Sequence, residues 1–438
     1  MPEAVEKIGT PGHGRMYLFF VRSFNDIDHM TPVVWKMSRD NFPVAVYCLN
    51  PDYDIYNDYR LNFLKELGVK VDFIYNDFDQ ELGSLHKILR FLFLKSFSLG
   101  RRWDSEPRKG LVIIRSIFGR LVQKIGSGLF KLSKKMFYGP KWACNVLRQS
   151  VAQALCFDHV RPKQYIIGSF LAAAEEMSVA TLALPHGVYL YTNDLVKVES
   201  TEESRYDKFN LFDYIVVQNK LRKEVLARSG VKGEKIFVLG SARYCDEWMS
   251  QYSKILPRML KSNGESAGKL KVVFMTTRPA YRIDVERMLR TFEMLSRLDE
   301  IEVVVKPHTR TGTEAHIYDN SPLAHVSDVS SVELCEWADV MLVIGSSIII
   351  EALTRGKPAL YLKYLHENTT EYEAFEACWI INGETELQDA LLLLRDGKGD
   401  VPYTDDNVNK WLAEIIYGGR SVRDVLSDYE EFIVNSAR

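Results

Sequence analysis

Residues 340–363 read VMLVIGSSIIIEALTRGKPALYLK, which is a short apolar strand, a Gly-Ser-Ser turn, a helix and a second short apolar strand. Both apolar runs are continuous, as is typical of parallel strands that are buried on both faces. A helix that connects two such strands makes a βαβ unit, and βαβ units assemble into a parallel sheet covered by helices. The stretch therefore predicts an α/β fold, in which ligands bind beyond the carboxyl ends of the strands.

The same alternation of strands and helices continues on both sides of this unit. The other predicted strands are residues 16–21, 44–49, 69–75, 164–167, 181–184, 214–218, 236–239, 271–275 and 302–305. The other predicted helices are residues 29–40, 57–67, 283–297, 330–338, 385–395, 405–417 and 421–436. A polar stretch with Gly and Ser, residues 258–270, separates two strand–helix series. We therefore expect two Rossmann-like parallel-sheet domains that face each other across a cleft.

The length and composition agree with two domains. The chain has 438 residues, 46% of them hydrophobic, which is enough to fill two cores. Its start lacks the apolar region of a signal peptide, no run approaches eighteen apolar residues, and six scattered cysteines favour a reducing cytoplasm. The expected parts are a polar tail (1–15), an N-terminal acceptor domain (16–257), a linker (258–270), a C-terminal nucleotide-donor domain (271–415) and a closing helix (416–438).

The first domain contains a strongly basic segment, residues 86–148. It holds fifteen Lys and Arg against two acidic residues, although the whole chain has a net charge of −2 and no nucleic-acid character. Apolar residues recur in it at helical spacing between the cations, which predicts an insertion of amphipathic helices. Such helices favour contact with an anionic membrane surface. The alternative is that their apolar faces pack inside the first domain and the cations are only solvated.

The Gly-Ser-Ser turn is the strongest candidate binding site. Gly345 lets the backbone approach a ligand, and the hydroxyls of Ser346 and Ser347 and the amides at the start of the helix suit a diphosphate. Glu351 lies one helical turn after Ser347 and could accept both hydroxyls of a ribose. The alternative is an ordinary Ser cap with an exposed Glu.

Basic residues follow two other predicted strands of the second domain. Lys306, His308 and Arg310 come after residues 302–305, at a Pro that ends the strand. Arg278 follows the first strand of this domain. These cations suit neutralisation of a phosphate at the same sheet edge, although the Lys-His-Arg group could also be a solvated basic turn.

Four side chains in the first domain are candidates for catalysis or ligand contact. His186 directly follows a predicted strand and could act as a general base, because an imidazole titrates near neutrality. Arg243 and Asp246 follow the last predicted strand of this domain and could line the cleft or pair with each other. Asp28 follows the first strand, where it could contact an acceptor or cap the next helix.

The order of these motifs resembles that of a known group of enzymes. They are His186-Gly187, Arg243 with Asp246, Arg278 after a strand, Lys306-Pro307-His308, and Ser346-Ser347 before a helix with Gly356-Lys357-Pro358. This order is similar to that of CDP-glycerol glycerophosphotransferases of teichoic-acid synthesis, and of capsule and lipopolysaccharide glycosyltransferases with the GT-B fold, including Kdo transferases. The resemblance covers about residues 186–379. It implies a GT-B fold, His186 as base, and a CMP-, CDP- or UDP-linked donor as substrate, with no further cofactor.

Two departures from the phosphotransferases favour a sugar donor. Ile344-Gly345 stands where they carry Asp-Tyr before the serines, and Pro185 stands where a Trp precedes their His. We therefore expect a glycosyltransferase that moves a sugar to a growing surface glycan, with a glycan or lipid-linked acceptor. His186, Asp246 and Asp28 would serve catalysis. We identify no DxD-type metal-binding motif and therefore expect no metal.

Three alternative functions and a cellular location are also expected from the sequence. The alternatives are a polyol-phosphate transferase that uses CDP-glycerol, a nucleotide-sugar 2-epimerase, and a membrane-recruited scaffold with a degenerate nucleotide site. The expected location is the cytoplasm, peripheral on the inner face of the plasma membrane through residues 86–148.

Overall fold

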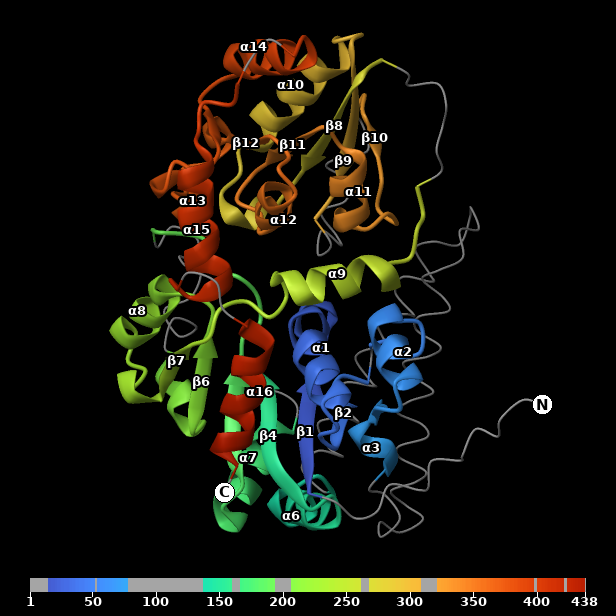
Figure 1. Cartoon of the computed structure of the whole chain (residues 1–438), viewed down its shortest axis with the longest axis vertical. Coiled ribbons are helices and arrows are strands. Elements are labelled where there is room, and N and C mark those ends of the chain that lie inside the picture. Colours follow the sequence, from blue (N-terminus) through green and yellow to red (C-terminus); the bar gives the residue numbers. More distant parts are fainter. Residues whose placement is uncertain are drawn as a thin grey trace, which may run out of the picture.

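The computed structural model contains two parallel-sheet domains stacked along the long axis of the molecule (Figure 1). It describes residues 15–51, 53–77, 137–159, 166–193, 206–260, 268–308, 321–397, 400–420 and 424–437. The predicted polar tail, most of the basic segment and Arg310 lie outside these residues. The predicted α/β class and the arrangement of two facing parallel-sheet domains are confirmed.

The sheet of the first domain has seven strands within the described residues, in the order β3-β2-β1-β4-β5-β6-β7, and all neighbours are parallel. Its central strands are almost completely buried because helices cover both faces, which explains their uninterrupted apolar sequences. The strands are β1 (Met16–Val21), β2 (Val44–Cys48), β3 (Lys70–Phe73), β4 (Ala152–Asp158), β5 (Ala180–Leu184), β6 (Tyr214–Val217) and β7 (Ile236–Val238).

The sheet of the second domain repeats this plan with six strands in the described part, in the order β10-β9-β8-β11-β12-β13. They are β8 (Leu270–Met275), β9 (Ile301–Lys306), β10 (Ala324–His325), β11 (Val340–Val343), β12 (Ala359–Leu362) and β13 (Trp379–Ile381). The strand order reverses between β1 and β4 in one sheet and between β8 and β11 in the other. Loops that leave these switch points are where ligands of such sheets bind.

The helices connect the strands in the expected alternation. They are α1 (Phe24–Arg39), α2 (Tyr59–Glu66), α3 (Ile74–Asp77), α6 (Pro140–Gln149), α7 (Ile167–Met177), α8 (Lys220–Arg228), α9 (Asp246–Ile255), α10 (Val285–Ser296), α11 (Ser331–Trp337), α12 (Ile348–Thr354), α13 (Glu371–Ala374), α14 (Glu384–Arg395), α15 (Asp405–Tyr417) and α16 (Val425–Ser436). Helix α9 runs between the two domains (Figure 1).

Several elements differ from the prediction. The strand after the basic segment is β4, not residues 164–167, since α7 begins at Ile167 and residues 160–165 lie outside the described part. The short strands β10 and β13 were not predicted. The first helix begins at Phe24, five residues before its predicted start at His29.

The end of the basic segment has a structural role. Helix α6 covers residues 140–149, and its apolar side, which includes Trp142 and Leu147, is buried in the first domain while Lys141 and Arg148 stay exposed. For this helix the alternative is therefore confirmed, because its apolar face packs inside the first domain and its cations are solvated. Among the described residues, no helix combines the length and apolar character needed to cross a bilayer.

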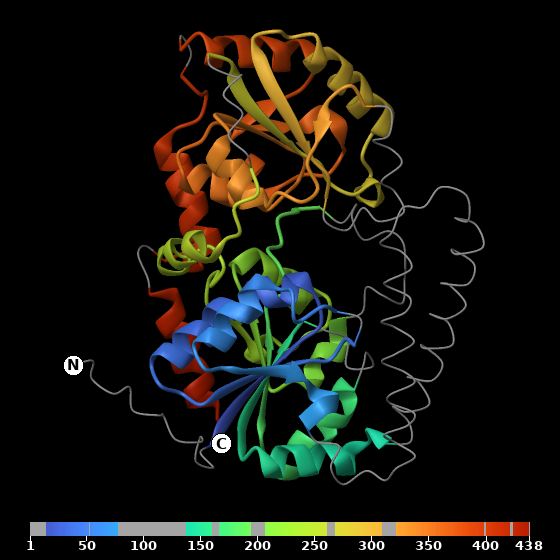
Figure 2. The same ribbon diagram turned by 90° about the vertical axis from the view of Figure 1, so that its right-hand side faces the viewer.

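The C-terminal helices return to the first domain. Helix α16 packs against α1 and β4, and the Tyr429 hydroxyl donates to the carbonyl of Gly240 at 2.9 Å (Figures 1 and 2). Gly240 has φ +86°, and a Cβ there would lie 2.2 Å from the carbonyl oxygen of Ile416. The chain thus crosses between the domains twice, which limits how far they can separate.

Candidate active site

A cleft of about 570 Å³ lies between the two domains. Its walls are the loops that follow β1, β5 and β7 in the first domain and β8, β9, β10 and β11 in the second. Of the predicted site residues it is lined by Asp28, Arg243, Lys306, His308, Gly345, Ser346 and Ser347. The carboxyl ends of the two sheets therefore face each other across one cavity, as the sequence predicted.

The Gly-Ser-Ser turn lies where the two domains touch. The Tyr191 hydroxyl of the first domain donates to the carbonyl of Gly345 at 3.1 Å, and the Tyr244 hydroxyl lies 3.4 Å from Ser347 Oγ. Gly345 has φ +60°, and a Cβ there would lie 2.5 Å from the Tyr191 hydroxyl, so only glycine fits. Ser347 precedes α12 and makes no side-chain cap bond. The turn is thus held by aromatic hydroxyls while its own amides and serine hydroxyls border the cleft.

A cation and two threonines flank this turn in the second domain. Lys306 ends β9, is buried, and donates from Nζ to the carbonyl of Ser327 at 2.6 Å. Burial lowers its pKa. Thr276 accepts the backbone N–H of His308 at 3.1 Å, and both Thr276 and Thr277 line the cleft. These groups suit an anionic ligand that lies along the second-domain wall.

Glu351 lies behind the cleft rather than in its wall. Its side chain is fully buried on α12, and Oε1 accepts hydrogen bonds from Arg355 Nη2 at 2.9 Å and Nε at 3.1 Å. Burial raises the pKa of the carboxyl group, against the opposing effect of Arg243 and Arg355. In this arrangement the carboxylate that was predicted to bind a ribose is instead paired with the guanidinium groups of Arg355 and Arg243.

Two further predicted residues lie outside the cleft lining. Asp246 is the first residue of α9, is exposed, and accepts a hydrogen bond from the Tyr417 hydroxyl at 3.1 Å. Arg278 is half-buried after β8 but is not among the residues that border the cavity. The structure therefore does not bring these two side chains together with the serine turn.

His186 forms an ionic cluster at the carboxyl ends of β1, β4 and β5. Its Nδ1 lies 2.7 Å from Asp158 and 3.1 Å from Asp26, and Arg22 pairs with both carboxylates. Burial alone would lower the pKa of His186, but its hydrogen bonds to Asp158 and Asp26 outweigh burial and raise the pKa to about 9. The ring is therefore protonated at neutral pH, whereas the predicted role as base requires the neutral ring. Its neighbour Gly187 lines the cleft.

The same three side chains are the group in the described residues that could hold a metal ion. Donor atoms of Asp26, Asp158 and His186 all lie within 4.8 Å of one another. However, Arg22 already provides a cation to both carboxylates, and protonated His186 provides a second. Burial and the neighbouring Asp26 raise the pKa of Asp158, and these two cations already offset the negative charge of the carboxylates, so the cluster does not need a metal for charge compensation.

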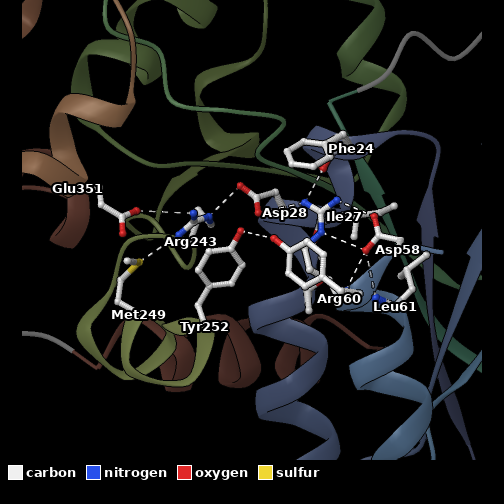
Figure 3. Close-up of polar contacts among 12 residues, drawn as sticks. Phe24, Ile27, Asp28, Asp58, Arg60, Leu61, Arg243, Met249, Tyr252 and Glu351 are labelled. Atoms are coloured by element: carbon white, nitrogen blue, oxygen red, sulfur yellow. Dashed lines mark hydrogen bonds and ion pairs between the residues drawn. The ribbon is translucent and has the colours of Figure 1, made fainter. Parts of the chain in front are cut away.

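Asp28 lies at the centre of a second ionic network, which Figure 3 shows. Its Oδ1 pairs with Arg60 at 3.1 Å and its Oδ2 with Arg243 at 2.8 Å. Although burial favours the neutral acid, these two arginines lower the pKa of Asp28 to about 2. Asp28 is thus a permanent anion in the cleft wall, suited to accept hydrogen bonds and poorly suited to accept protons. The adjacent His29 also lines the cleft, and burial lowers its pKa to about 4.

Sequence reasoning missed several residues of the site. Asp158 was missed because β4 was not predicted, although an Asp at the end of a buried strand is a signal that could have found it. Asp26 lies in the first turn of α1, a common position for an ordinary carboxylate. Nothing in the sequence indicates that Tyr191 and Tyr244 reach across to the other domain.

Comparisons with known proteins agree with the fold. No protein-family model matches the chain, and no curated protein matches it in sequence. Solved structures do match along nearly its whole length. They include S. aureus MnaA with UDP (13% identity, 97% of this chain and 98% of that chain, TM-score 0.52). UDP-N-acetylglucosamine 2-epimerase from Rickettsia bellii also matches (12%, 96% and 96%, 0.53). A third match is UDP-GlcNAc 2-epimerase from Neisseria meningitidis bound to UDP-GlcNAc (13%, 96% and 98%, 0.51).

These matches correct the expected activity. The sequence predicted a glycosyltransferase that builds a surface glycan, but the fold is that of 2-epimerases, which the sequence analysis held only as an alternative. At such low identity the likeness establishes the shared two-domain fold. The motif order that suggested transferases is consistent with the same fold, because loops after equivalent strands come in the same order in both groups.

Proposed function

We propose that this chain is an enzyme that binds a UDP-sugar between its domains and inverts the configuration of the sugar at C2. The observation that supports the proposal most is that the two walls of the cleft carry different chemical groups. Donors for a diphosphate border one wall, and a histidine and a carboxylate border the other. The fold shared with UDP-sugar epimerases supports this assignment over other reactions of nucleotide-sugars.

In the proposed complex the diphosphate lies against the second domain. The amides and hydroxyls of residues 345–347, the hydroxyl of Thr277 and the cation of Lys306 would hold its oxygens. The sugar then faces the first domain, where Asp28 offers an acceptor for a sugar hydroxyl. No acceptor molecule is required in this reaction.

The chemistry of C2 inversion suits two histidines of the first domain, His29 in the cleft lining and His186 next to the lining residue Gly187. The C2–H bond must break and re-form on the other face. As a base removes the C2 proton, the C–H electron pair forms a C1–C2 double bond and the C1–O bond pair leaves with the diphosphate. The diphosphate oxygen then bonds to C1 again, and the double-bond electrons take up a proton at C2 on the opposite face. His29 is neutral at pH 7 and can accept a proton, whereas His186 is protonated and can donate one. Environments that push the pKa values of two groups apart in this way are typical of acid and base partners.

The test is to incubate the chain with UDP-GlcNAc in D₂O without any acceptor and to follow the sugar by ¹H NMR. We expect the signals of the C2 epimer to appear and the H2 signal to disappear, because the donated proton comes from solvent-exchanged groups. His186→Gln should reduce the rate at least about tenfold, since a general acid contributes about 10²–10⁴-fold. His325→Gln, a histidine outside the cleft, is the matched control.

Two results would oppose the proposal. A nucleotide-sugar that binds but shows neither a new epimer nor loss of the H2 signal would exclude epimerisation. Equal activity of His186→Gln and His325→Gln would show that the proton donor lies elsewhere.

A further inference from the structure

A series of side chains with alternating charges extends from the first domain to the second. It runs through Asp58, Arg60, Asp28, Arg243, Glu351 and Arg355, which belong to α2 and its N-cap, to α1, to the connection after β7, and to α12 and its C-cap. Figure 3 shows this series from Asp58 to Glu351. Most of these side chains are buried; Asp28 and Arg243 line the cleft, and Glu351 lies behind it. Buried charges are tolerated only when they are paired, so the partners in this charge series constrain the positions of the side chains strongly.

The part of the charge series that lies in the first domain is held by several close contacts. Arg60 is fully buried, stacks on the Phe24 ring with its guanidinium carbon 3.9 Å from the ring centre, and pairs with Asp58 at 2.7 Å. Asp58 in turn caps α2 by accepting the backbone N–H groups of residues 60 and 61. These contacts fix Arg60, and Arg60 fixes Asp28.

Arg243 is also fixed by the first domain. Its Nε donates to Asp28 at 2.8 Å, its Nη1 donates to the Met249 sulfur at 3.0 Å, and its guanidinium lies over the Tyr252 ring at 4.2 Å. Only its Nη2 faces the other domain.

The ion pair through which this charge series crosses between the domains is the longest pair of the series. Arg243 Nη2 lies 3.8 Å from Glu351 Oε2, whereas the other pairs measure 2.7–3.1 Å. Glu351 Oε2 is buried and accepts no hydrogen bond from any described residue. A carboxylate oxygen in that state gains from a small approach of Arg243, because an unpaired buried acceptor is costly.

We infer that Arg243 and Glu351 form a positioning pair that shortens when a nucleotide occupies the serine turn, and so couples nucleotide binding to closure of the domains. Glu351 lies on α12, which begins directly after residues 345–347, so a pull on the turn moves Glu351 with it. The shortened pair would then hold Asp28 in place against the sugar. This inference rests on the proposed function, and it gives both residues a role without ligand contact.

A double-mutant cycle on UDP affinity separates this role from direct ligand contact. The variants are Arg243→Met, Glu351→Gln and the double variant, titrated with UDP by calorimetry. We expect each single variant to weaken UDP binding about tenfold and the double variant to be no weaker than either single one, as for residues that act through one contact. Two independent ligand contacts would instead multiply to about a hundredfold loss, which would overturn the inference.

Small-angle scattering provides a second readout. The wild-type chain should contract when UDP is added, and Glu351→Gln should bind UDP with less contraction. If Glu351→Gln contracts as much as the wild-type chain, the Arg243–Glu351 pair does not couple UDP binding to closure of the domains. Should Arg243→Met fail to fold, Arg243→Lys keeps the positive charge but has one nitrogen in place of three, so it cannot pair with Asp28 and Glu351 in the same way, and the same non-additivity is expected.

The controls distinguish this inference from the proposed function. Arg39 and Glu247 form an exposed pair within the first domain, and Arg39→Met and Glu247→Gln should leave UDP binding unchanged. If the wild-type chain does not bind UDP, the proposed function fails and the inference fails with it. If it binds UDP and the cycle is additive, the inference alone fails.

Discussion

At the scale of single residues, His186 illustrates how neighbours decide a chemical role. The imidazole alone predicts a base near neutrality, but two buried carboxylates hold its proton and raise its pKa to about 9. The side chain is 34% exposed, so it keeps access to solvent. The residue type could be predicted from the sequence as chemically important, whereas its protonation state depends on Asp26 in the first turn of α1 and Asp158 at the end of β4, which are distant from it in sequence.

Protonated His186 should make the stability of the protein depend on pH. Its folded pKa exceeds the ordinary value of 6.5, so its contribution is complete below about pH 6.5 and is lost as the pH rises through 9. We expect a loss of about 1–2 kcal/mol between pH 6.5 and 9.5, after allowance for solvent screening. Urea unfolding across this range measures it. His186→Gln should lack this loss and His325→Gln should keep it, and equal pH profiles for all three proteins would contradict the cluster.

Gly345 provides a second prediction at this scale. Gly345→Ala introduces both a strained φ and a clash with the Tyr191 hydroxyl, whereas Gly356→Ala introduces similar strain (φ +64°) into open space. We expect Gly356→Ala to cost about 1 kcal/mol and Gly345→Ala about 2–3 kcal/mol of unfolding free energy. Only Gly345→Ala should also weaken UDP binding. Equal effects of both substitutions would mean that Tyr191 does not pack on the turn.

At the scale of helices and strands, the second domain was the easier to predict. Its βαβ unit around residues 340–363 has continuous apolar strands, and the helix and second strand predicted there are α12 and β12. In the first domain, Ile166 and Ile167 suggested a strand, but the Ala-rich run that follows favours a helix and draws Ile167 into α7. The true strand β4 contains small and polar residues, and α6 and α16 pack against it.

The C-terminal helix offers a test at this scale. Tyr429 is buried and donates to the carbonyl of Gly240, so Tyr429→Phe should cost about 1–2 kcal/mol of unfolding free energy. Tyr417→Phe removes a hydrogen bond to exposed Asp246 and should cost less than about 0.5 kcal/mol. Chemical denaturation of both variants measures the difference. If Tyr429→Phe is as mild as Tyr417→Phe, α16 does not anchor the first domain.

At the scale of the whole molecule, most of the second-domain wall of the site follows from sequence, whereas only Asp28 and Arg243 of the first-domain wall were predicted site residues. Residues 345–347, Lys306 and His308 each follow a predicted strand, and parallel strands bring such loops to one edge. Contacts across the domains, such as Tyr191 with Gly345 and Arg243 with Glu351, depend on how the two sheets face each other. That arrangement is set by α15 and α16, and the sequence pattern carries no signal for it.

The uneven charge of the chain gives a prediction that remains to be tested. Residues 86–148 concentrate fifteen cations, and most of them lie outside the described part. If they contact membrane, the protein should sediment with vesicles that contain anionic lipid, less so at high salt, and not with zwitterionic vesicles. Failure to sediment with either kind of vesicle would favour the packed alternative that α6 already follows.

The central claim is that the cleft between the two sheets is built for a uridine diphosphate. The most direct measurement is a calorimetric titration of the wild-type chain with UDP, with CMP, CDP and GDP titrated in parallel. We predict one UDP site per chain, weakened by Gly345→Ala and unchanged by Gly356→Ala. A chain that binds none of these nucleotides, or binds UDP equally well after Gly345→Ala, would contradict the account.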